Sequence, residues 1–228
     1  MSRTPGVRFW PLATFLWLTA CGGSLPPPDW KLNAQGALEA YEKHYLGGDT
    51  RLAELNFAKA KAAIARSGRL DLMARAELAR CATRTSALTY DDCPGFKSLA
   101  ADAAPAETAY AAFLDGHWQD LDGQSLPKQY GALLGARDDA ARAEAMDKIA
   151  DPQARLIAAA LLFRQGWLSP KGIASAIDTA SERGWRRPLL AWLRVEEKRT
   201  ESAGDKPRLE QLRKRIDLIL TSTPALQD

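Results

Sequence analysis

The chain has 228 residues, a formal net charge of +3 and a mean hydropathy of −0.30. It contains only two histidines, His44 and His117, far apart in the sequence. The sequence lacks the Gly-x-Ser-x-Gly elbow of serine hydrolases, the His-Glu-x-x-His motif of zinc proteases and a glycine-rich phosphate-binding loop. These absences exclude the enzyme classes that the motifs define. We therefore expect no catalytic residue, no cofactor and no metal.

The first 20 residues have the layout of a secretory signal. Arg3 and Arg8 precede an uncharged apolar segment, residues 9–20, which ends in small residues. This segment is well short of the roughly 20 residues that a helix needs to cross a bilayer. We therefore expect residues 1–20 to be a signal peptide and not a membrane span.

The sequence Leu-Thr-Ala-Cys at residues 18–21 resembles the lipobox of bacterial lipoproteins. In that family the chain is cut before the cysteine and the sulfur is acylated, so the resemblance implies that Cys21 is lipidated. In such lipoproteins an Asp after the cysteine favours retention at the inner membrane. Gly22 and Gly23 stand there instead, which implies the periplasmic face of the outer membrane. The alternative is an ordinary signal cut near Ala20, which leaves a free cysteine.

Residues 21–30 are expected to join the lipid to the folded body. They include Gly, Ser and three consecutive prolines, a composition typical of an extended tether. Several acyl chains hold a protein firmly to a leaflet, since each buried methylene contributes about 0.8 kcal/mol. The membrane is thus one expected partner, reached through the lipid anchor alone.

Beyond residue 30, apolar residues follow a helical rather than an alternating spacing, and no convincing strand is found. Helix starts are marked by capping residues or proline, and helix ends by glycine. The predicted helices begin after Asp49, Asp151, Ser169 and Asp205, and at Pro188. We predict an all-α fold of helical hairpins in two lobes. These comprise residues 31–116 and 128–228, joined by a loop at 117–127.

One hairpin, residues 45–64, resembles the tetratricopeptide repeat. The residues that carry the resemblance are Gly48, Ala53, Phe57 and Ala60. Tyr41 departs from the pattern because the family has a small residue there. A second, looser candidate lies at residues 163–185. The resemblance implies a short tetratricopeptide-like solenoid, and the alternative is an irregular all-helical domain without repeats.

Two cysteines remain once Cys21 is assigned to lipid. Cys81 and Cys93 flank a helix end and a polar turn. In an oxidising compartment such a pair favours a structural disulfide, which stabilises by roughly 3 kcal/mol for a loop of this size. Two free thiols, or a redox-active or metal-binding pair, are the alternatives. The redox-active or metal-binding alternative has little support, because the sequence has neither a Cys-x-x-Cys spacing nor a histidine close to these cysteines.

The segment 115–128 interrupts the helical pattern. Asp120, Asp122 and Gly123 invite comparison with a calcium-binding loop, but Trp118 stands where the first ligand belongs and no glutamate closes the loop. A connection between the lobes is the preferred interpretation. His117 and Trp118 leave open a small-ligand site.

Charge is concentrated near the C-terminus. Residues 183–215 contain 11 Lys and Arg against 5 Asp and Glu, whereas residues 22–182 contain 18 against 21. Cationic side chains alternate with tryptophans in the basic stretch, which suits an anionic partner. The predicted partner-binding residues are Arg186, Arg187, Arg194 and Arg199. The alternative is a solvated face with local ion pairs.

Two functions follow from these observations. The favoured one is a lipid-anchored, non-catalytic scaffold or adaptor that binds another protein of the cell envelope, as assembly or pilot lipoproteins do. Anionic lipid or glycan is a further partner class, and nucleic acid is not expected in this compartment. The alternative is an envelope enzyme or small-ligand binder. Glu201 and Ser202 superficially match a lytic transglycosylase site, but a helix end and a linker follow them.

Overall fold

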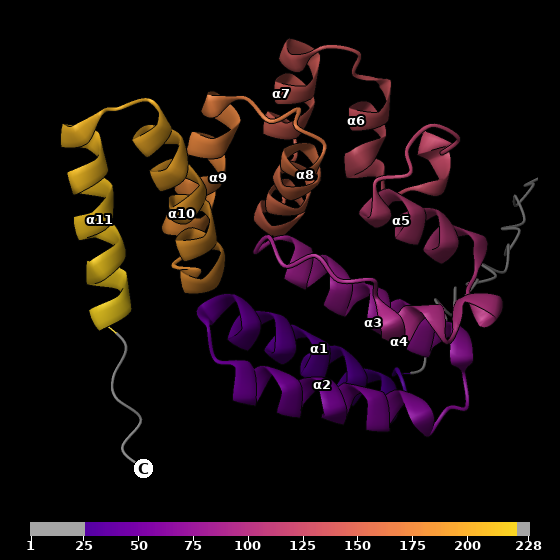
Figure 1. Ribbon diagram of the computed structural model, residues 1–228. Coiled ribbons are helices and arrows are strands. Elements are labelled where there is room, and N and C mark those ends of the chain that lie inside the picture. Colours follow the sequence, from indigo (N-terminus) through magenta and orange to yellow (C-terminus); the bar gives the residue numbers. More distant parts are fainter. Residues whose placement is uncertain (1–25, 223–228) are drawn as a thin grey trace, which may run out of the picture.

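The computed structural model describes residues 26–222, and Figure 1 shows that this part of the chain is built of helices. No strand is present among these residues. The predicted signal peptide and Cys21 lie outside the described residues. None of the described helices is both long and apolar enough to cross a membrane.

The α-helices are α1 (Asp29–Gly47), α2 (Thr50–Ala65), α3 (Leu70–Thr85), α4 (Pro94–Lys97), α5 (Pro105–Asp115), α6 (Gly131–Gly135), α7 (Asp139–Asp147), α8 (Pro152–Arg164), α9 (Pro170–Glu182), α10 (Arg186–Ser202) and α11 (Lys206–Thr221). Three short 3₁₀ helices are η1 (Ala100–Asp102), η2 (Gly123–Ser125) and η3 (Lys128–Tyr130). The all-α fold predicted from the sequence is confirmed.

Capping side chains fix where the long helices begin. At each predicted cap the side chain accepts a hydrogen bond from the backbone N–H three residues later, which satisfies a donor that the helix itself leaves free. These caps are Asp49, Asp151, Ser169 and Asp205. α10 begins at Arg186, two residues before the start predicted at Pro188. Proline is tolerated there because the first helical N–H groups have no intrahelical partner.

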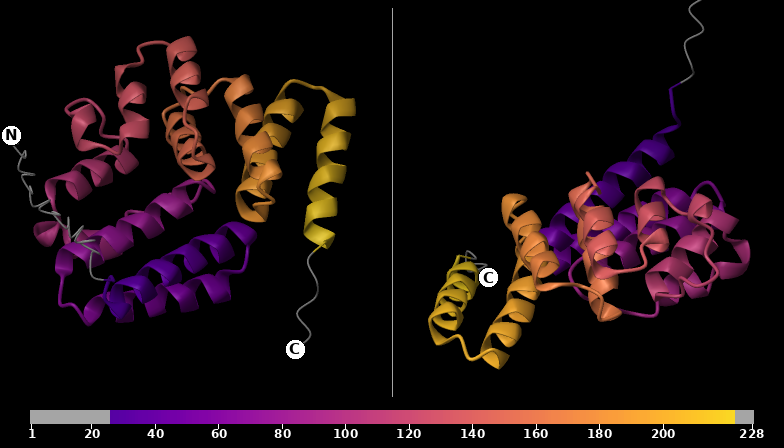
Figure 2. Two further views of the ribbon diagram at one scale, coloured as in Figure 1. Left: turned by 180° about the vertical axis from the view of Figure 1, so that it is seen from behind. Right: turned by 90° about the horizontal axis from the view of Figure 1, so that it is seen from above.

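Successive helices pack as hairpins. α1 packs on α2, α8 on α9, α9 on α10, and α10 on α11. Figure 1 shows α6 to α11 standing in a row, with α5 oblique to them and α1, α2 and α3 running beneath the row; Figure 2 gives two further views. α1 touches α10 and α3 touches α8, so the two parts of the chain are in direct contact.

Helix α3 separates two hydrophobic cores. The smaller core joins α1 and α2 to one side of α3, with Tyr41, Tyr45 and Phe57 at its centre. The larger core runs from the other side of α3 through to α11. Leu78 belongs to the larger core and Ala76, two residues away, to the smaller one. The division between the cores therefore follows α3 and does not coincide with the loop predicted at 117–127.

Cys81 and Cys93 form a disulfide that links α3 to the start of α4. Their Cα atoms lie 5.8 Å apart, within the range of about 4.4–6.8 Å found for bridged cysteines. The two cysteines predicted to pair thus lie at disulfide distance from each other. Cys93 has a left-handed backbone with φ of 46°, which turns the chain sharply into α4.

The central segment is packed against the larger core. Trp118 stacks on Phe113 with ring centroids 5.1 Å apart, and Leu126 is buried. Asp122 caps η2 by accepting a hydrogen bond from the backbone N–H of Gln124 at 3.0 Å. Residues 117–127 are thus a connection held in place by apolar contacts on both sides.

Candidate functional site: a groove between α1 and α3

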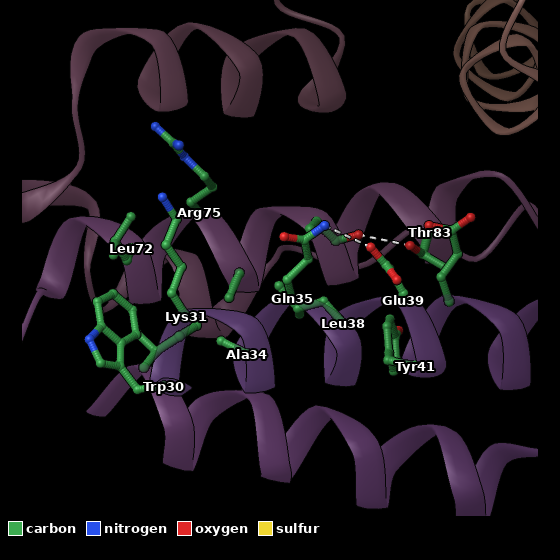
Figure 3. Close-up of a pocket in the computed structure, with 14 residues that line it drawn as sticks. Trp30, Lys31, Ala34, Gln35, Leu38, Glu39, Tyr41, Leu72, Arg75 and Thr83 are labelled. Carbon is green, nitrogen blue, oxygen red and sulfur yellow. Dashed lines mark hydrogen bonds between the residues drawn. The ribbon is translucent and has the colours of Figure 1, made fainter. Parts of the chain in front are cut away.

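A groove of about 430 Å³ runs between α1 and α3 (Figure 3). Its walls are mainly apolar, and the apolar side chains recur every three or four residues, which places them along one face of each helix. On α1 and α3 these residues are Trp30, Ala34, Leu38, Tyr41, Leu72, Ala76 and Ala79. Ile64 at the end of α2 completes the floor. The groove is therefore an elongated apolar surface bordered by two parallel rows of side chains.

Opposite charges lie at the two ends of the groove. Figure 3 shows Lys31 and Arg75 near Trp30 at one end, and Glu39 near Tyr41 and Thr83 at the other. The Arg75 guanidinium is bonded to Glu107 at 2.6 Å. Lys31 has no ion-pair partner within the part of the chain that the structure describes. The groove thus distinguishes between the two directions in which a charged segment could lie in it.

Glu42 lies at the acidic end, half-buried. Burial raises the pKa of Glu42 above its ordinary value, and the nearby charges of Asp151 and Glu39 raise it further. With its amide oriented to satisfy both neighbours, Gln153 of α8 donates to the Glu42 carboxylate at 3.1 Å and accepts from the Thr83 hydroxyl at 3.0 Å. This end of the groove is a polar junction between α1, α3 and α8.

Tyr41 contributes a buried hydroxyl to the groove wall. Its ring packs on Tyr45 and Phe57, at centroid distances of 5.8 and 5.3 Å. No described residue forms a hydrogen bond with the Tyr41 hydroxyl, although the side chain is 1% exposed. Burial raises the pKa of this phenol, so it stays protonated as a donor. An unpartnered buried hydroxyl costs about 1–3 kcal/mol, which makes it unusual outside binding sites.

A second hollow of about 440 Å³ continues along α3 towards α5. Arg75 and Ala79 line both hollows. The second one adds Leu78, Tyr110 and Leu126. Apolar surface therefore extends from α1 over the exposed side of α3 to α5, and the Arg75–Glu107 ion pair stands between the two parts.

Two of the predicted partner-binding arginines, Arg186 and Arg187, form hydrogen bonds within the protein. Arg187 donates to the Tyr45 carbonyl and to the Thr50 hydroxyl, both at 2.7 Å. Arg186 donates to the Ile219 carbonyl at 3.3 Å. Both side chains are half-buried, and they tie α10 to the first hairpin and to α11.

Arg194 and Arg199 are exposed but carry local ion pairs. Arg194 bonds Glu197 at 2.8 Å, and Arg199 bonds Glu196 at 2.7 Å. The hydrogen bonds from Arg199 hold the pKa of Glu196 below its usual range. Of the four predicted arginines, these two remain at the surface, and the four do not form one continuous patch.

The described residues bring no catalytic constellation together. Their one group of three candidate metal ligands is Cys81, Asp91 and Cys93, and the disulfide engages two of these. His117 is exposed, and Glu201 bonds Arg213 at 3.1 Å on the surface. Comparison with known proteins gives no match to a protein-family model, a curated protein or a solved structure. The geometry of the chain alone supports the proposals below.

Proposed function

We propose that the protein is a lipid-anchored, non-catalytic helical adaptor of the bacterial cell envelope that binds a segment of another envelope protein in the groove between α1 and α3. The groove is the observation that supports this proposal, because it combines an apolar floor with charged ends. The tetratricopeptide-like segment at residues 45–64, which covers the end of α1 and most of α2, is consistent with the same role, since stacked hairpins of such helices present surfaces to partners.

The segment that fits is an amphipathic helix. Two adjacent helices that expose apolar rows every three or four residues form a groove into which a third helix can pack. Leu38 and Leu72 are half-buried in the free protein, so a docked helix would complete their removal from water. Burial of apolar area contributes about 25 cal/mol per Å², which makes these rows the main source of affinity.

Charge gives the docked helix a direction. Lys31, near Trp30, favours an acidic residue of the partner, whereas Glu39 and Glu42 favour a basic one. Such pairs add specificity more than affinity, because the wrong orientation places like charges together.

The tether restricts where the partner can be. α1 begins at Asp29, directly after the prolines, and Trp30 lies at the basic end of the groove. A fully extended polyproline segment rises about 3.1 Å per residue, so residues 21–28 reach about 25 Å. With Cys21 acylated, the groove is held close to the leaflet. The partner is therefore a protein that exposes its helix near the periplasmic face of the outer membrane.

Site-specific photo-crosslinking in intact cells tests the proposal. A photoreactive amino acid at Ala79 lies in the groove, and the same amino acid at Leu55 lies on α2, on a 49% exposed side chain outside it. We expect a discrete crosslinked product from position 79 and none from position 55. Mass spectrometry of the product should identify a peptide with apolar residues at helical spacing. Equal products from both positions, or none from position 79, would contradict the proposal.

Arg194 and Arg199 support a second, weaker contact in this proposal. Both are exposed on α10, near the hollow formed with Phe163, Ile173 and Val195. These cations attract an anionic surface, such as that of an acidic protein or lipid. Added salt screens this attraction beyond about 8 Å. Reversing both charges to Glu should lower capture of the crosslinked partner at low salt and have little effect at high salt.

A further inference from the structure

The central segment helps to form a separate pocket on another side of the molecule. Its volume is about 370 Å³, and polar atoms make up most of its exposed lining, unlike that of the groove. It lies between residues 118–121, α6, the start of α7 and the residue that follows the turn after α8. The residues that bear its chemistry are Trp118, Gln119, Arg137, Arg142 and Trp167. None of them lines the groove between α1 and α3.

Two tryptophans form one wall of this pocket. The rings of Trp118 and Trp167 meet edge to face with centroids 5.7 Å apart. The Trp118 indole N–H donates to the Phe113 carbonyl at 2.9 Å, and the ring stacks on Phe113. Trp167 keeps 36% of its surface exposed. The first ring is thus fixed, and the part of the second ring that stays exposed is open to a ligand.

The end of α8 holds the tryptophan wall in place. Arg164 donates to the Leu114 carbonyl at 2.6 Å, and Gln165 donates to the Gly116 carbonyl at 3.0 Å. Gly116 has a φ of 83°, so the chain turns sharply here from α5 towards Trp118. Two long-range hydrogen bonds therefore fix the turn that presents Trp118 to Trp167. Such preorganisation reduces the entropy lost when a ligand binds.

Two arginines face the tryptophans. The Arg142 guanidinium lies over the Trp167 ring, 4.4 Å from its centroid, and bonds Asp139 at 3.0 Å. It also donates to the Arg137 carbonyl at 3.4 Å. The Arg137 side chain is exposed and has no ion-pair partner within residues 26–222. The free Arg137 guanidinium suits a planar anion, which it can bind through two N–H groups, and the ordered Arg142 adds positive charge beside it.

We infer that this pocket binds a sugar ring that carries a carboxylate. The apolar face of a pyranose packs on an indole ring, as Trp167 permits, and Gln119 offers both a donor and an acceptor for hydroxyl groups. Arg137 supplies the unpaired positive charge for the carboxylate, and Arg142 supports it. The volume suits one or two rings, at the lower end of small-molecule sites.

This inference goes beyond the adaptor function and does not depend on it, because the pocket and the groove share no residue. It gives a role to Trp118 of the central segment, a residue that has no place in a calcium-binding loop. The sequence led us to expect an anionic partner at the basic stretch that includes α10. The inference instead places one such partner, an acidic sugar, in this pocket.

Calorimetric titration of the purified full chain in detergent tests the inference with three probes. N-acetylmuramic acid has the ring of N-acetylglucosamine plus a lactyl carboxylate, and lactate has the carboxylate without the ring. We expect the acidic sugar to bind at least about tenfold more tightly than either of the others, since a charge-assisted pair contributes about 1.5–3 kcal/mol. Equal affinity for the two sugars, preference for lactate, or no binding of the acidic sugar would overturn the inference.

Three variants locate the site. Arg137→Gln removes an exposed charge and should weaken binding of the acidic sugar about tenfold without affecting the melting temperature. Trp167→Leu should abolish binding of the acidic sugar. Arg183→Gln is the matched control, because Arg183 also lies over a tryptophan, Trp185 at 5.4 Å, but outside the pocket. Unchanged affinity in the Arg137 variant, or an equal loss in the control, would contradict the assignment.

Discussion

Arg187 and Tyr45 are 142 residues apart in sequence, yet the Arg187 guanidinium donates to the Tyr45 carbonyl at 2.7 Å and lies 4.2 Å from the centroid of its ring. The carbonyl belongs to the last turn of α1, where a cation is favoured, and it also accepts from the Gly48 backbone N–H at 3.1 Å. The Arg187 side chain thus fastens α10 to the end of α1.

We expect Arg187→Ala to lower the free energy of unfolding by about 1–3 kcal/mol, because a charge-assisted hydrogen bond and a cation–π contact are lost together. Urea denaturation followed by circular dichroism measures the change. Arg183→Ala is the control, since Arg183 is exposed and its guanidinium lies over Trp185, and should change stability by less than about 0.5 kcal/mol. A loss no larger than that of the control would show that Arg187 does not fasten α10.

Reduction of the Cys81–Cys93 disulfide should destabilise the protein by roughly 3 kcal/mol, because the unfolded chain regains the entropy of a closed loop. Mass spectrometry without reductant should give a chain two hydrogens lighter than after reduction. The double variant Cys81→Ala/Cys93→Ala should unfold at the lower denaturant concentration of the reduced protein and show no further response to reductant. Labelling of both thiols in freshly isolated protein would contradict the bridge.

Tyr41→Phe should leave the free protein as stable as before or up to about 1 kcal/mol more stable, because it removes a buried hydroxyl that lacks a partner. Tyr45→Phe is the control, since the Tyr45 hydroxyl donates to the Thr89 hydroxyl at 3.4 Å, and should not stabilise. A clear loss of stability on removing the Tyr41 hydroxyl would mean that it does have a partner.

Glu42 should make stability depend on pH. Its pKa is raised in the folded state, so the folded protein binds a proton more tightly than the unfolded chain. The free energy of unfolding therefore falls as the pH rises from the ordinary glutamate pKa to the raised one. At neutral pH the full cost of burying the ionised Glu42 carboxylate remains. Glu42→Gln should accordingly be more stable than the parent at pH 7 and equal to it well below the ordinary glutamate pKa.

Chemical denaturation at the two pH values measures this difference. Glu144→Gln is the matched control: Glu144 is exposed, and its hydrogen bond to Lys148 lowers its pKa, so its replacement should give no gain at pH 7. If Glu42→Gln gave no gain in stability at neutral pH, the hydrogen bond from Gln153 would fully offset the cost of burying the Glu42 charge.

Cys21→Ser should release the protein from the membrane fraction or leave it unprocessed, since the proposed acyl chains supply the membrane affinity. Fractionation of cells and incorporation of labelled fatty acid measure the effect. Unchanged incorporation in the variant would contradict lipidation at this residue, whereas a soluble variant that still crosslinks through Ala79 would separate anchoring from binding.

The parts of the fold that sequence predicted are those set by local chemistry. Asp151 followed by Pro152 specifies a helix start without reference to the rest of the chain, and the structure has it there. α3 gave no clear signal because it is buried on two sides, so its apolar residues do not form a single stripe. The groove was missed for a related reason. The spacing from Trp30 to Tyr41 on α1 looks the same whether another helix covers it or not.

Long-range partners explain the other differences. Composition located positive charge near the C-terminus, but it could not show that Arg187 reaches Tyr45 or that Arg186 reaches the carbonyl of Ile219. Likewise, Trp118 was noted in its own loop, whereas its partner Trp167 lies beyond α8. Charges and aromatics are visible in a sequence, but their neighbours depend on the tertiary fold.

Helix α3 has a consequence for how the molecule can be divided. Because opposite sides of this one helix complete both cores, a cut before α3 deprives the smaller core of a wall, and a cut after it exposes the apolar side of α3 that α8 covers. Loss of order in α3 would therefore disturb both cores at once. We expect residues 26–222 to unfold as a single cooperative unit, and a helix docked against α3 to protect the distant α11 as well as the groove that holds it.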